Sequence, residues 1–249
     1  MSEPFTVEEL KRRAAEYAVE RFVRDGMVVG LGTGSTARYA LEAIARRLRT
    51  GEWRNVRGVP TSRATAELAR ALGIPLTTLE ECPVVDVTVD GADEVDPHMN
   101  LIKGLGGALL WEKIVAVASQ REVIIVDERK RVPRLGTRSP LPVEVVPFGW
   151  SRTLRFLEAL GGEPRLRVEA HGRQEQPVIT DGGHYIVDCH FPGGIPDPEG
   201  LAARLCAWPG VVEHGLFLNL ATEVVVATSQ GIEVMQRDTG ETGAVHSVG

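Results

Sequence analysis

The length, composition and charge of the chain exclude several classes of protein. It has 249 residues, 43% of them hydrophobic and 25% charged, so a sizeable folded core is expected and global disorder is not. A net charge of −6 without a basic stripe argues against a nucleic-acid partner. No apolar run approaches the roughly 18 residues of a membrane span. Residues 1–13 contain no apolar signal-peptide core, so we expect no membrane partner.

The cysteines and histidines give no sign of a metal site. The three cysteines, Cys82, Cys189 and Cys206, are widely separated and match no metal-ligand spacing. They cannot all pair with one another, which is typical of a reducing compartment. The six histidines show no ligand spacing either. We therefore expect a cytoplasmic protein that holds no metal ion.

The first predicted elements are a helix, a strand, a polar loop and a second helix. A capping box at residues 6–9 opens the first helix, and Gly26 ends it. The apolar residues 27–31 are typical of a short buried strand. The loop at residues 32–36 then leads into the second helix.

This loop is a candidate phosphate site, and its residues are Thr33, Gly34, Ser35 and Thr36. Glycine lets backbone N–H groups approach an anion, the hydroxyls add donors, and the helix N-terminus contributes partial positive charge. Residues 32–37 also satisfy the dinucleotide fingerprint G-x-G-x-x-A, but residues 59–62 end the next strand without the expected acidic residue. A monophosphate or a polyhydroxy group is favoured, and a turn without any ligand is the alternative.

Strands and helices continue to alternate along the first half of the chain. Further strands are predicted at residues 54–60, 74–78, 84–89 and 122–126. This alternation predicts an α/β fold with a doubly wound, mostly parallel, Rossmann-like sheet. Polar clusters stand at the ends of successive strands, at residues 33–36, 61–63, 90–93 and 127–130. Open α/β sheets bind ligands along that edge, so the clusters are expected to meet there.

Residues 90–113 carry the densest group of chemically useful side chains. Asp90 and Asp93 follow a buried strand, and a glycine-rich turn after Lys103 leads into a helix that carries Glu112. Carboxylates, an ammonium group and loop N–H groups together predict a site that holds a small anion and moves a proton. The alternatives are an ordinary turn and loop, with a solvent-facing Glu112 paired to Lys103 or Lys113.

The pattern changes after residue 138. Strands are predicted at residues 143–146, 165–168, 177–180 and 185–189, with helices at 151–160, capped by Ser151, and at 201–208. Final strands are predicted at residues 223–227 and 233–235. We expect a catalytic α/β domain at residues 1–140 and 218–236, a small α+β domain at 141–217 and a flexible tail at 237–249.

Five segments carry a family resemblance. They are GLGTGSTA at residues 30–37, DGADE at 90–94, KGLGGALLWEK at 103–113, LPVEVVPF at 141–148 and PGVVEHGLF at 209–217. In the same order, and over nearly the whole chain, they closely resemble the type A ribose-5-phosphate isomerase family. The resemblance implies that family's fold, and its members are commonly homodimers or homotetramers.

The resemblance also implies an activity and a set of residues. The activity is the interconversion of D-ribose 5-phosphate and D-ribulose 5-phosphate in the non-oxidative branch of the pentose phosphate pathway, without a metal ion or cofactor. The implied catalytic residues are Glu112, Asp90 and Lys103. The implied substrate-binding residues are Thr33, Gly34, Ser35, Thr36, Asp90, Gly91, Ala92, Asp93, Lys103, Gly104, Leu105, Gly106 and Lys130. Leu105 departs from the glycine of many members, and a positive φ there would cost roughly 1–2 kcal/mol.

Aldose–ketose isomerisation through an enediol needs one base and one electrophile. Partial burial beside Trp111 would raise the pKa of Glu112 and suit it to act as the base. Lys103 and the loop amides could stabilise the enediolate oxygen, although Lys103 could instead contact the phosphate. Asp90 and Asp93 could bind sugar hydroxyls, and one of them could assist ring opening. The phosphate candidates are Ser35, Thr36 and Lys130.

Three other functions remain open from the sequence. A non-catalytic sugar-phosphate sensor would share the phosphate loop but would not need Glu112. A nicotinamide-dependent oxidoreductase would need NAD as a cofactor. An acyl- or CoA-transferase would use Glu112 as a nucleophile.

Overall fold

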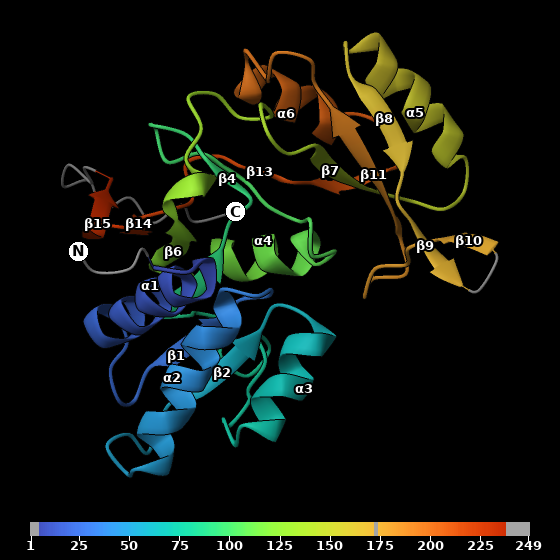
Figure 1. Cartoon of the computed structure of the whole chain (residues 1–249). Helices are drawn as coiled ribbons and strands as arrows, with labels where there is room; N and C mark the ends of the chain where they lie inside the picture. Colours follow the sequence, from blue (N-terminus) through green and yellow to red (C-terminus); the bar gives the residue numbers. More distant parts are fainter. Residues whose placement is uncertain (1–4, 172–173, 238–249) are drawn as a thin grey trace, which may run out of the picture.

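The computed structural model describes residues 5–171 and 174–237, which fold around a six-stranded sheet (Figure 1). The strand order is β15-β14-β6-β3-β1-β2, and all neighbours are parallel except β15, which runs antiparallel to β14. The strands are β1 (Val28–Leu31), β2 (Arg57–Pro60), β3 (Val87–Gly91), β6 (Glu122–Asp127), β14 (Glu223–Thr228) and β15 (Gly231–Gln236). The predicted mostly parallel α/β sheet is confirmed.

Helices cover both faces of this sheet because side chains alternate along each strand. Val29 and Leu31 of β1 share a core with Ala14 and Ile44 on one face, whereas Val28 packs on the other face with residues of another helix. The helices are α1 (Val7–Phe22), α2 (Ala37–Arg49), α3 (Arg63–Ala71) and α4 (Leu109–Val117). The sheet is therefore doubly wound, with α1 and α2 on one face and α4 on the other.

The start of α1 follows directly from its sequence. The hydroxyl of Thr6 accepts the N–H of Glu9 at 3.3 Å, and the Glu9 carboxylate accepts the N–H of Thr6 at 2.6 Å, so the predicted capping box is present. The first helical residue of α2 follows Thr36, whose hydroxyl makes no capping bond. Within the described ranges, no helix combines the length and the apolar character that crossing a membrane requires.

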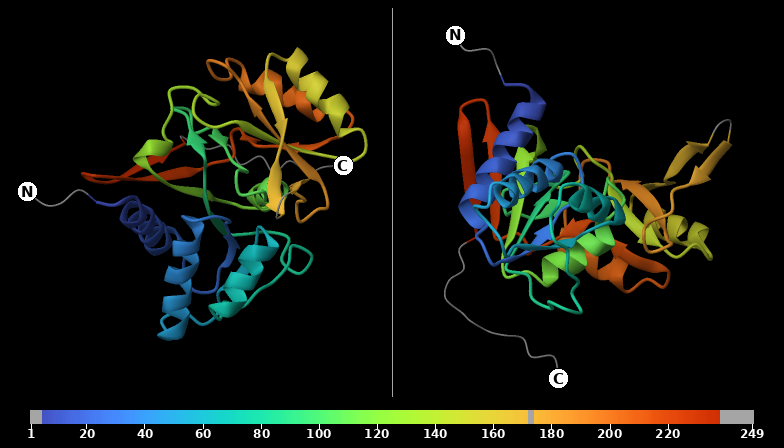
Figure 2. Two further views of the ribbon diagram at one scale, coloured as in Figure 1. Left: turned by 45° about the vertical axis from the view of Figure 1, so that its right-hand side comes forward. Right: turned by 90° about the horizontal axis from the view of Figure 1, so that it is seen from below.

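A separate four-stranded antiparallel sheet lies to one side of the large sheet (Figure 2). Its order is β12-β7-β11-β8, and Leu157, Leu201 and Leu205 of two helices share its core. These elements are β7 (Leu141–Val145), α5 (Trp150–Ala159), β8 (Glu163–Leu166), β11 (Tyr185–His190), α6 (Pro198–Cys206) and β12 (Val211–His214). A hairpin of β9 (Val168–His171) and β10 (Gln174–Pro177) extends from it. The domain division at residues 141 and 217 stays a prediction.

A three-stranded sheet, which the sequence did not predict, connects these parts. It pairs β4 (Glu94–Val95) with β5 (Leu101–Ile102), and β5 with β13 (Leu216–Phe217). Directly after β5, the N–H of Lys103 donates to the carbonyl of Gly215 at 2.9 Å. A Cβ on Gly215 would come within 2.2 Å of the Lys103 carbonyl oxygen, so this position suits glycine. The segment around Gly215 thus fixes the backbone of Lys103.

Three local predictions were wrong. The strand expected at residues 74–78 is a single bridge between Leu76 and Gly58, because Pro75 has no N–H with which to continue a ladder. The helix expected to start at Ser151 begins one residue earlier and has Gly149, at φ 71°, as its cap. Of the strand expected at residues 177–180, Pro177 is the last residue of β10, and Ile179 makes a single bridge to Tyr185 of β11. Residues 238–249 of the expected tail lie outside the described ranges.

Candidate active site

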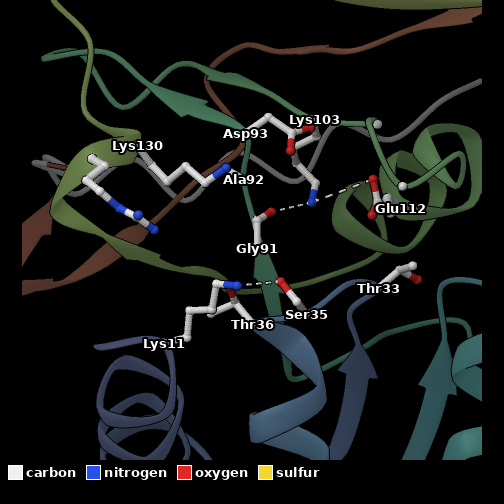
Figure 3. A pocket seen from close by; sticks show the side chains of 13 residues that line it. Lys11, Thr33, Ser35, Thr36, Gly91, Ala92, Asp93, Lys103, Glu112 and Lys130 are labelled. Carbon is white, nitrogen blue, oxygen red and sulfur yellow. Dashed lines mark hydrogen bonds and ion pairs between the residues drawn. The ribbon is translucent and has the colours of Figure 1, made fainter. Parts of the chain in front are cut away.

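The strand order creates a crevice between β1 and β3. From β1 the chain continues to β2 on one side and later to β3 on the other, and open α/β sheets bind ligands at such a reversal. A cavity of about 170 Å³ lies there, beside the end of β3 and the start of α4 (Figure 3). Its lining residues are Lys11, Thr33, Ser35, Thr36, Gly91, Ala92, Asp93, Lys103, Gly104, Gly106, Glu112, Arg129 and Lys130.

Most residues predicted for the site line this cavity. From the predicted set these are Thr33, Ser35, Thr36, Gly91, Ala92, Asp93, Lys103, Gly104, Gly106, Glu112 and Lys130. Gly34, Asp90 and Leu105 lie next to lining residues but are not among those that line it. Lys11 and Arg129 line the cavity and were missed. The four strand-end clusters therefore meet only in part, because residues 61–63 contribute no lining residue.

One end of the cavity is rich in positive charge. Lys11 reaches it from α1, and its Nζ donates to the hydroxyl of Ser35 at 3.0 Å. Arg129 and Lys130 come from a 3-10 turn, Glu128–Lys130, directly after β6. The first turn of α2, which follows Thr36, contains no acidic residue. Two of these cations form ion pairs, Lys11 with Glu8 at 2.8 Å and Arg129 with Asp127 at 2.7 Å. Three cations and a helix N-terminus together create an environment that suits an anionic group.

The two missed cations had only weak signals in the sequence. Lys11 lies on the same side of α1 as Ala14 and Ala15, which are buried, and not on the solvent side of the helix. Its side chain is accordingly only 15% exposed. Arg129 precedes Lys130, and its guanidinium pairs with Asp127 at 2.7 Å. Lys11 lies on a helix, where the strand-edge argument does not apply, whereas Arg129 falls inside the predicted strand-end cluster at residues 127–130 and was not singled out from it.

Thr33 joins the phosphate loop to the end of the neighbouring strand. Its hydroxyl lies 2.7 Å from that of Thr61 and 2.9 Å from those of Ser62 and Thr65. Its N–H donates to Oδ1 of Asp90 at 3.1 Å. The predicted polar cluster at residues 61–63 therefore contacts the phosphate loop through the hydroxyl of Thr33 and does not line the cavity.

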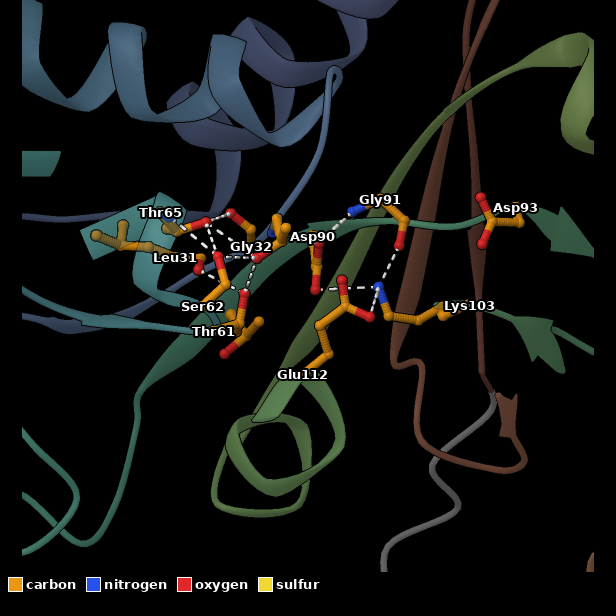
Figure 4. Close-up of polar contacts among 12 residues, drawn as sticks. Leu31, Gly32, Thr61, Ser62, Thr65, Asp90, Gly91, Asp93, Lys103 and Glu112 are labelled. Carbon is orange, nitrogen blue, oxygen red and sulfur yellow. Dashed lines mark hydrogen bonds and ion pairs between the residues drawn. The ribbon is translucent and has the colours of Figure 1, made fainter. Parts of the chain in front are cut away.

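At the opposite end of the cavity, one ammonium group lies between two carboxylates (Figure 4). Nζ of Lys103 is 3.0 Å from Oδ2 of Asp90 and 3.6 Å from Oε2 of Glu112, and it donates to the carbonyl of Gly91 at 2.5 Å. The Lys103, Asp90 and Glu112 side chains are 2%, 1% and 5% exposed. Oε2 of Glu112 accepts no hydrogen bond from any described residue. The ion pair with Lys103, at 3.6 Å, involves this same oxygen.

Burial sets the protonation of this cluster. The pKa of Glu112 is raised to about 8: burial is the main cause, the Lys103 ammonium opposes it, and the nearby carboxylates of Asp90 and Asp93 add to it. Burial alone would lower the pKa of Lys103, but the carboxylates of Asp90 and Glu112 outweigh it, so the net shift is upward. Lys103 is therefore a permanent cation, whereas Glu112 can exchange a proton near neutral pH.

The glycine-rich turn between Lys103 and α4 contains one bulky residue, Leu105, and its backbone is not strained there. Gly104 and Gly107 have positive φ values of 106° and 84°, which glycine adopts without cost. Among the described residues other than glycine, Leu105 is not one of those with positive φ. Its N–H donates to Oδ2 of Asp93 at 3.0 Å. The strain considered for Leu105 is thus absent.

The acidic residues of the cavity do not form a metal centre within the described ranges. No group of three or more His, Cys, Asp or Glu side chains there is arranged to hold a metal ion. Asp90 and Glu112 have Lys103 as their shared partner.

Comparison with known protein families shows which family the chain belongs to. The family model of ribose 5-phosphate isomerase A (phosphoriboisomerase A) matches residues 57–231. The chain belongs to this family. The ribose-5-phosphate isomerase A of Roseiflexus castenholzii is 58% identical over 222 residues, which cover 89% of this chain and 93% of that protein.

Solved structures of the family agree with the fold. A D-ribose-5-phosphate isomerase solved in complex with phospho-erythronic acid has a TM-score of 0.90 and 41% identity, and the match covers 94% of this chain and all of that one. Ribose 5-phosphate isomerase A from Methanocaldococcus jannaschii has a TM-score of 0.87, also at 41% identity, over 93% of this chain. The family resemblance predicted from the motifs is confirmed.

Proposed function

We propose that the protein interconverts D-ribose 5-phosphate and D-ribulose 5-phosphate through an enediol, with Glu112 carrying the proton between C2 and C1. Membership of an isomerase family supports the substrate pair. One observation supports the mechanism above all: Glu112 lines the cavity and its carboxylate is buried beside the Lys103 ammonium, at the far end of the cavity from three cations. A phosphate among the cations would direct the sugar carbons toward Glu112.

The phosphate group would bind among Lys11, Arg129 and Lys130, with Ser35 and Thr36 as further donors. The cations compensate its charge, and the first turn of α2 adds partial positive charge. This assignment leaves Lys103 to the reacting end, because its ammonium is already held by Asp90 and the carbonyl of Gly91. It therefore favours the enediolate oxygen over the phosphate as the partner of Lys103.

Proton transfer by Glu112 is supported by its surroundings. A general base works best when its pKa lies near the working pH, and burial raises the pKa of Glu112 to about 8. The carboxylate would remove the proton from one carbon of the substrate and return it to the neighbouring carbon on the same face. No net oxidation occurs, because the two electrons stay within the sugar.

Stabilisation of the enediolate oxygen would come from Lys103 and from loop N–H groups. Oδ1 of Asp90 accepts the N–H groups of Gly91 and Thr33, and Oδ2 forms the ion pair with Lys103, so we propose that Asp90 holds Lys103 in place. Asp93 lines the cavity, and we assign it the sugar hydroxyls and the proton transfer that opens the ring.

The decisive experiment compares Glu112→Gln with wild type in D₂O. Wild type should form the ketose with partial incorporation of solvent deuterium. Glu112→Gln should lose about 10²–10⁴-fold in kcat, the usual contribution of a general base. Inhibition by inorganic phosphate should be unchanged, because the cations remain. Glu67→Gln, at an exposed position of α3, is the matched control.

The same assay separates the other functions that the sequence left open. Turnover without added NAD contradicts a nicotinamide-dependent oxidoreductase, and turnover without any thioester contradicts a CoA-transferase. A sensor would bind the sugar phosphate and convert none of it. Full activity of Glu112→Gln would end the proposed mechanism while leaving the family assignment in place.

We further propose a cytoplasmic homodimer or homotetramer that uses no cofactor and acts in the non-oxidative branch of the pentose phosphate pathway. All three cysteines are free thiols, which agrees with a reducing compartment. Light scattering on the purified protein distinguishes the two assemblies from a monomer. Limited proteolysis near residues 140 and 218 tests the proposed domain division.

A further inference from the structure

Arg167 connects the four-stranded sheet with the glycine-rich turn, although it does not line the cavity. The residue lies between β8 and β9, and its side chain is 15% exposed. Its Nε and Nη2 donate to the two carboxylate oxygens of Asp188 on β11, at 2.7 and 2.5 Å. Its Nη1 donates to two successive carbonyls of the turn, Gly104 at 3.2 Å and Leu105 at 3.0 Å. One guanidinium group thus fixes two peptide units at once.

The orientation of those peptide units follows from their covalent geometry. In a planar trans peptide the C=O and the N–H point in opposite directions. Because the carbonyls of Gly104 and Leu105 point to Arg167, the N–H groups of Leu105 and Gly106 point away from it. The Leu105 N–H donates to Oδ2 of Asp93. Asp93 and Gly106 both line the cavity. Both donors are therefore directed to the cavity side of the turn.

We propose that Arg167, held by Asp188, is a positioning residue that aims the N–H of Gly106 at an oxygen of the reacting sugar and orients the N–H of Leu105 so that it holds Asp93 at the cavity. The inference rests on the proposed isomerase function. The turn contains three glycines in four residues at 104–107, and glycine has more backbone freedom than any other residue. One hydrogen bond, from the Gly107 N–H to the Gly104 carbonyl at 3.0 Å, closes the turn from within. Arg167 adds an external clamp on two of its carbonyls and prepares the donors before substrate binds.

The chemistry of the clamp requires arginine. The guanidinium presents five donors in a planar fork, which allows a bidentate pair with Asp188 and leaves a further edge for the two carbonyls. Lysine has three donors on a single atom and cannot span both partners in this geometry. The charge also polarises the two peptide units, which makes their N–H groups stronger donors.

Arg167 could instead serve only to fasten the four-stranded sheet to the rest of the molecule. The two roles predict different measurements. A fastening role would lower stability and impair every function of the cavity together. A positioning role would lower kcat and leave phosphate binding intact, because Lys11 and Lys130 lie at the other end of the cavity (Figure 3).

The test compares Arg167→Ala, Arg167→Lys and Asp188→Asn with Arg165→Ala, an exposed arginine on β8, as the matched control. We expect kcat of Arg167→Ala to fall on the order of 10-fold to 100-fold, the effect of misplacing a donor by about 1 Å. Inhibition by inorganic phosphate should stay within about twofold. Added guanidinium should restore part of the activity of Arg167→Ala. Arg165→Ala should match wild type.

A second readout does not depend on catalysis. Hydrogen exchange and ¹⁵N chemical shifts of the Leu105 and Gly106 amides should change in Arg167→Ala and not in Arg165→Ala. Wild-type kcat in a folded Arg167→Ala, or unchanged amides, would overturn the inference. So would a loss of kcat that parallels equal losses of phosphate inhibition and thermal stability. If wild type itself converts no ribose 5-phosphate, the proposed function fails, and the amide measurements still decide whether Arg167 orders the turn.

Discussion

Oε2 of Glu112 lies 3.6 Å from Nζ of Lys103, and both side chains are almost completely buried. Asp90 holds the same ammonium more closely, at 3.0 Å. The positive charge is therefore shared unequally, and Glu112 receives the smaller part of its stabilisation. This arrangement keeps Glu112 basic while it keeps Lys103 charged, which is the combination that a proton transfer next to a developing oxyanion requires.

The pH dependence of the rate should report Glu112. Its carboxylate must be ionised to accept a proton, and burial raises its pKa to about 8. We expect kcat/KM to rise with pH through this value and to level off above it. Initial rates across that range measure the profile. A profile that is flat from neutral pH upward would contradict the assignment, since the substrate phosphate finishes its ionisation at lower pH.

The same raised pKa predicts how stability depends on pH. In the unfolded chain Glu112 titrates near its ordinary value of about 4.3, so between that pH and about 8 the folded state binds more protons. Its contribution to stability is thus fully present below the unfolded value and is lost as pH rises through about 8. Glu112→Gln carries no titrating group and should gain thermal stability relative to wild type between about pH 6 and pH 9. For the control Glu67→Gln, the difference in thermal stability from wild type should stay constant over this pH range.

Removal of the Lys103 ammonium should affect both rate and stability. Lys103→Met leaves Asp90 and Glu112 buried without a cation, and breaking a buried ion pair on one side costs about 3–5 kcal/mol. Urea unfolding measures this loss. The double variant Lys103→Met, Asp90→Asn should lose less than the sum of the single variants, because neither charge is then left alone. Additive losses would mean that the two groups do not stabilise each other.

Lys11 should contribute to substrate binding more than to chemistry. A charge-assisted hydrogen bond to phosphate is worth about 1.5–3 kcal/mol, so Lys11→Ala should raise KM about 10-fold to 100-fold. Its kcat should change little, because Lys11 lies at the phosphate end of the cavity. Arg21→Ala, at an exposed position of the same helix, is the control. A fall in kcat with unchanged KM would place Lys11 at the reacting end instead.

The sequence predicts those parts of the site that obey a rule of the parallel sheet. The phosphate loop follows β1, Asp93 follows β3 and Lys130 follows β6, so the strand-edge argument finds all three. It misses Lys11, because a helix contributes this residue from the side. It also cannot separate Asp90 from Asp93, since both belong to one short polar segment and only the fold turns Asp93 toward the cavity.

The fold is predictable where periodic patterns are long. The capping box of α1 and the apolar strands β1 and β6 were recognised because several residues repeat one signal. The pairing of β5 with β13 was not, because each strand has two residues and their partners are far apart in sequence. This missed pairing fixes the backbone next to Lys103, so the least predictable contact supports a central residue of the proposed site.

The bond between Lys103 and Gly215 has a consequence for protein synthesis. The ribosome makes the segment around Gly215 well after the loops that carry the charged groups, and domains generally fold as the chain emerges. A nascent chain that ends before this segment has the ammonium and both carboxylates but lacks the strand that seats them. Truncated products released before this segment would therefore be inactive, and catalytic competence would begin only after the segment around Gly215 has been made.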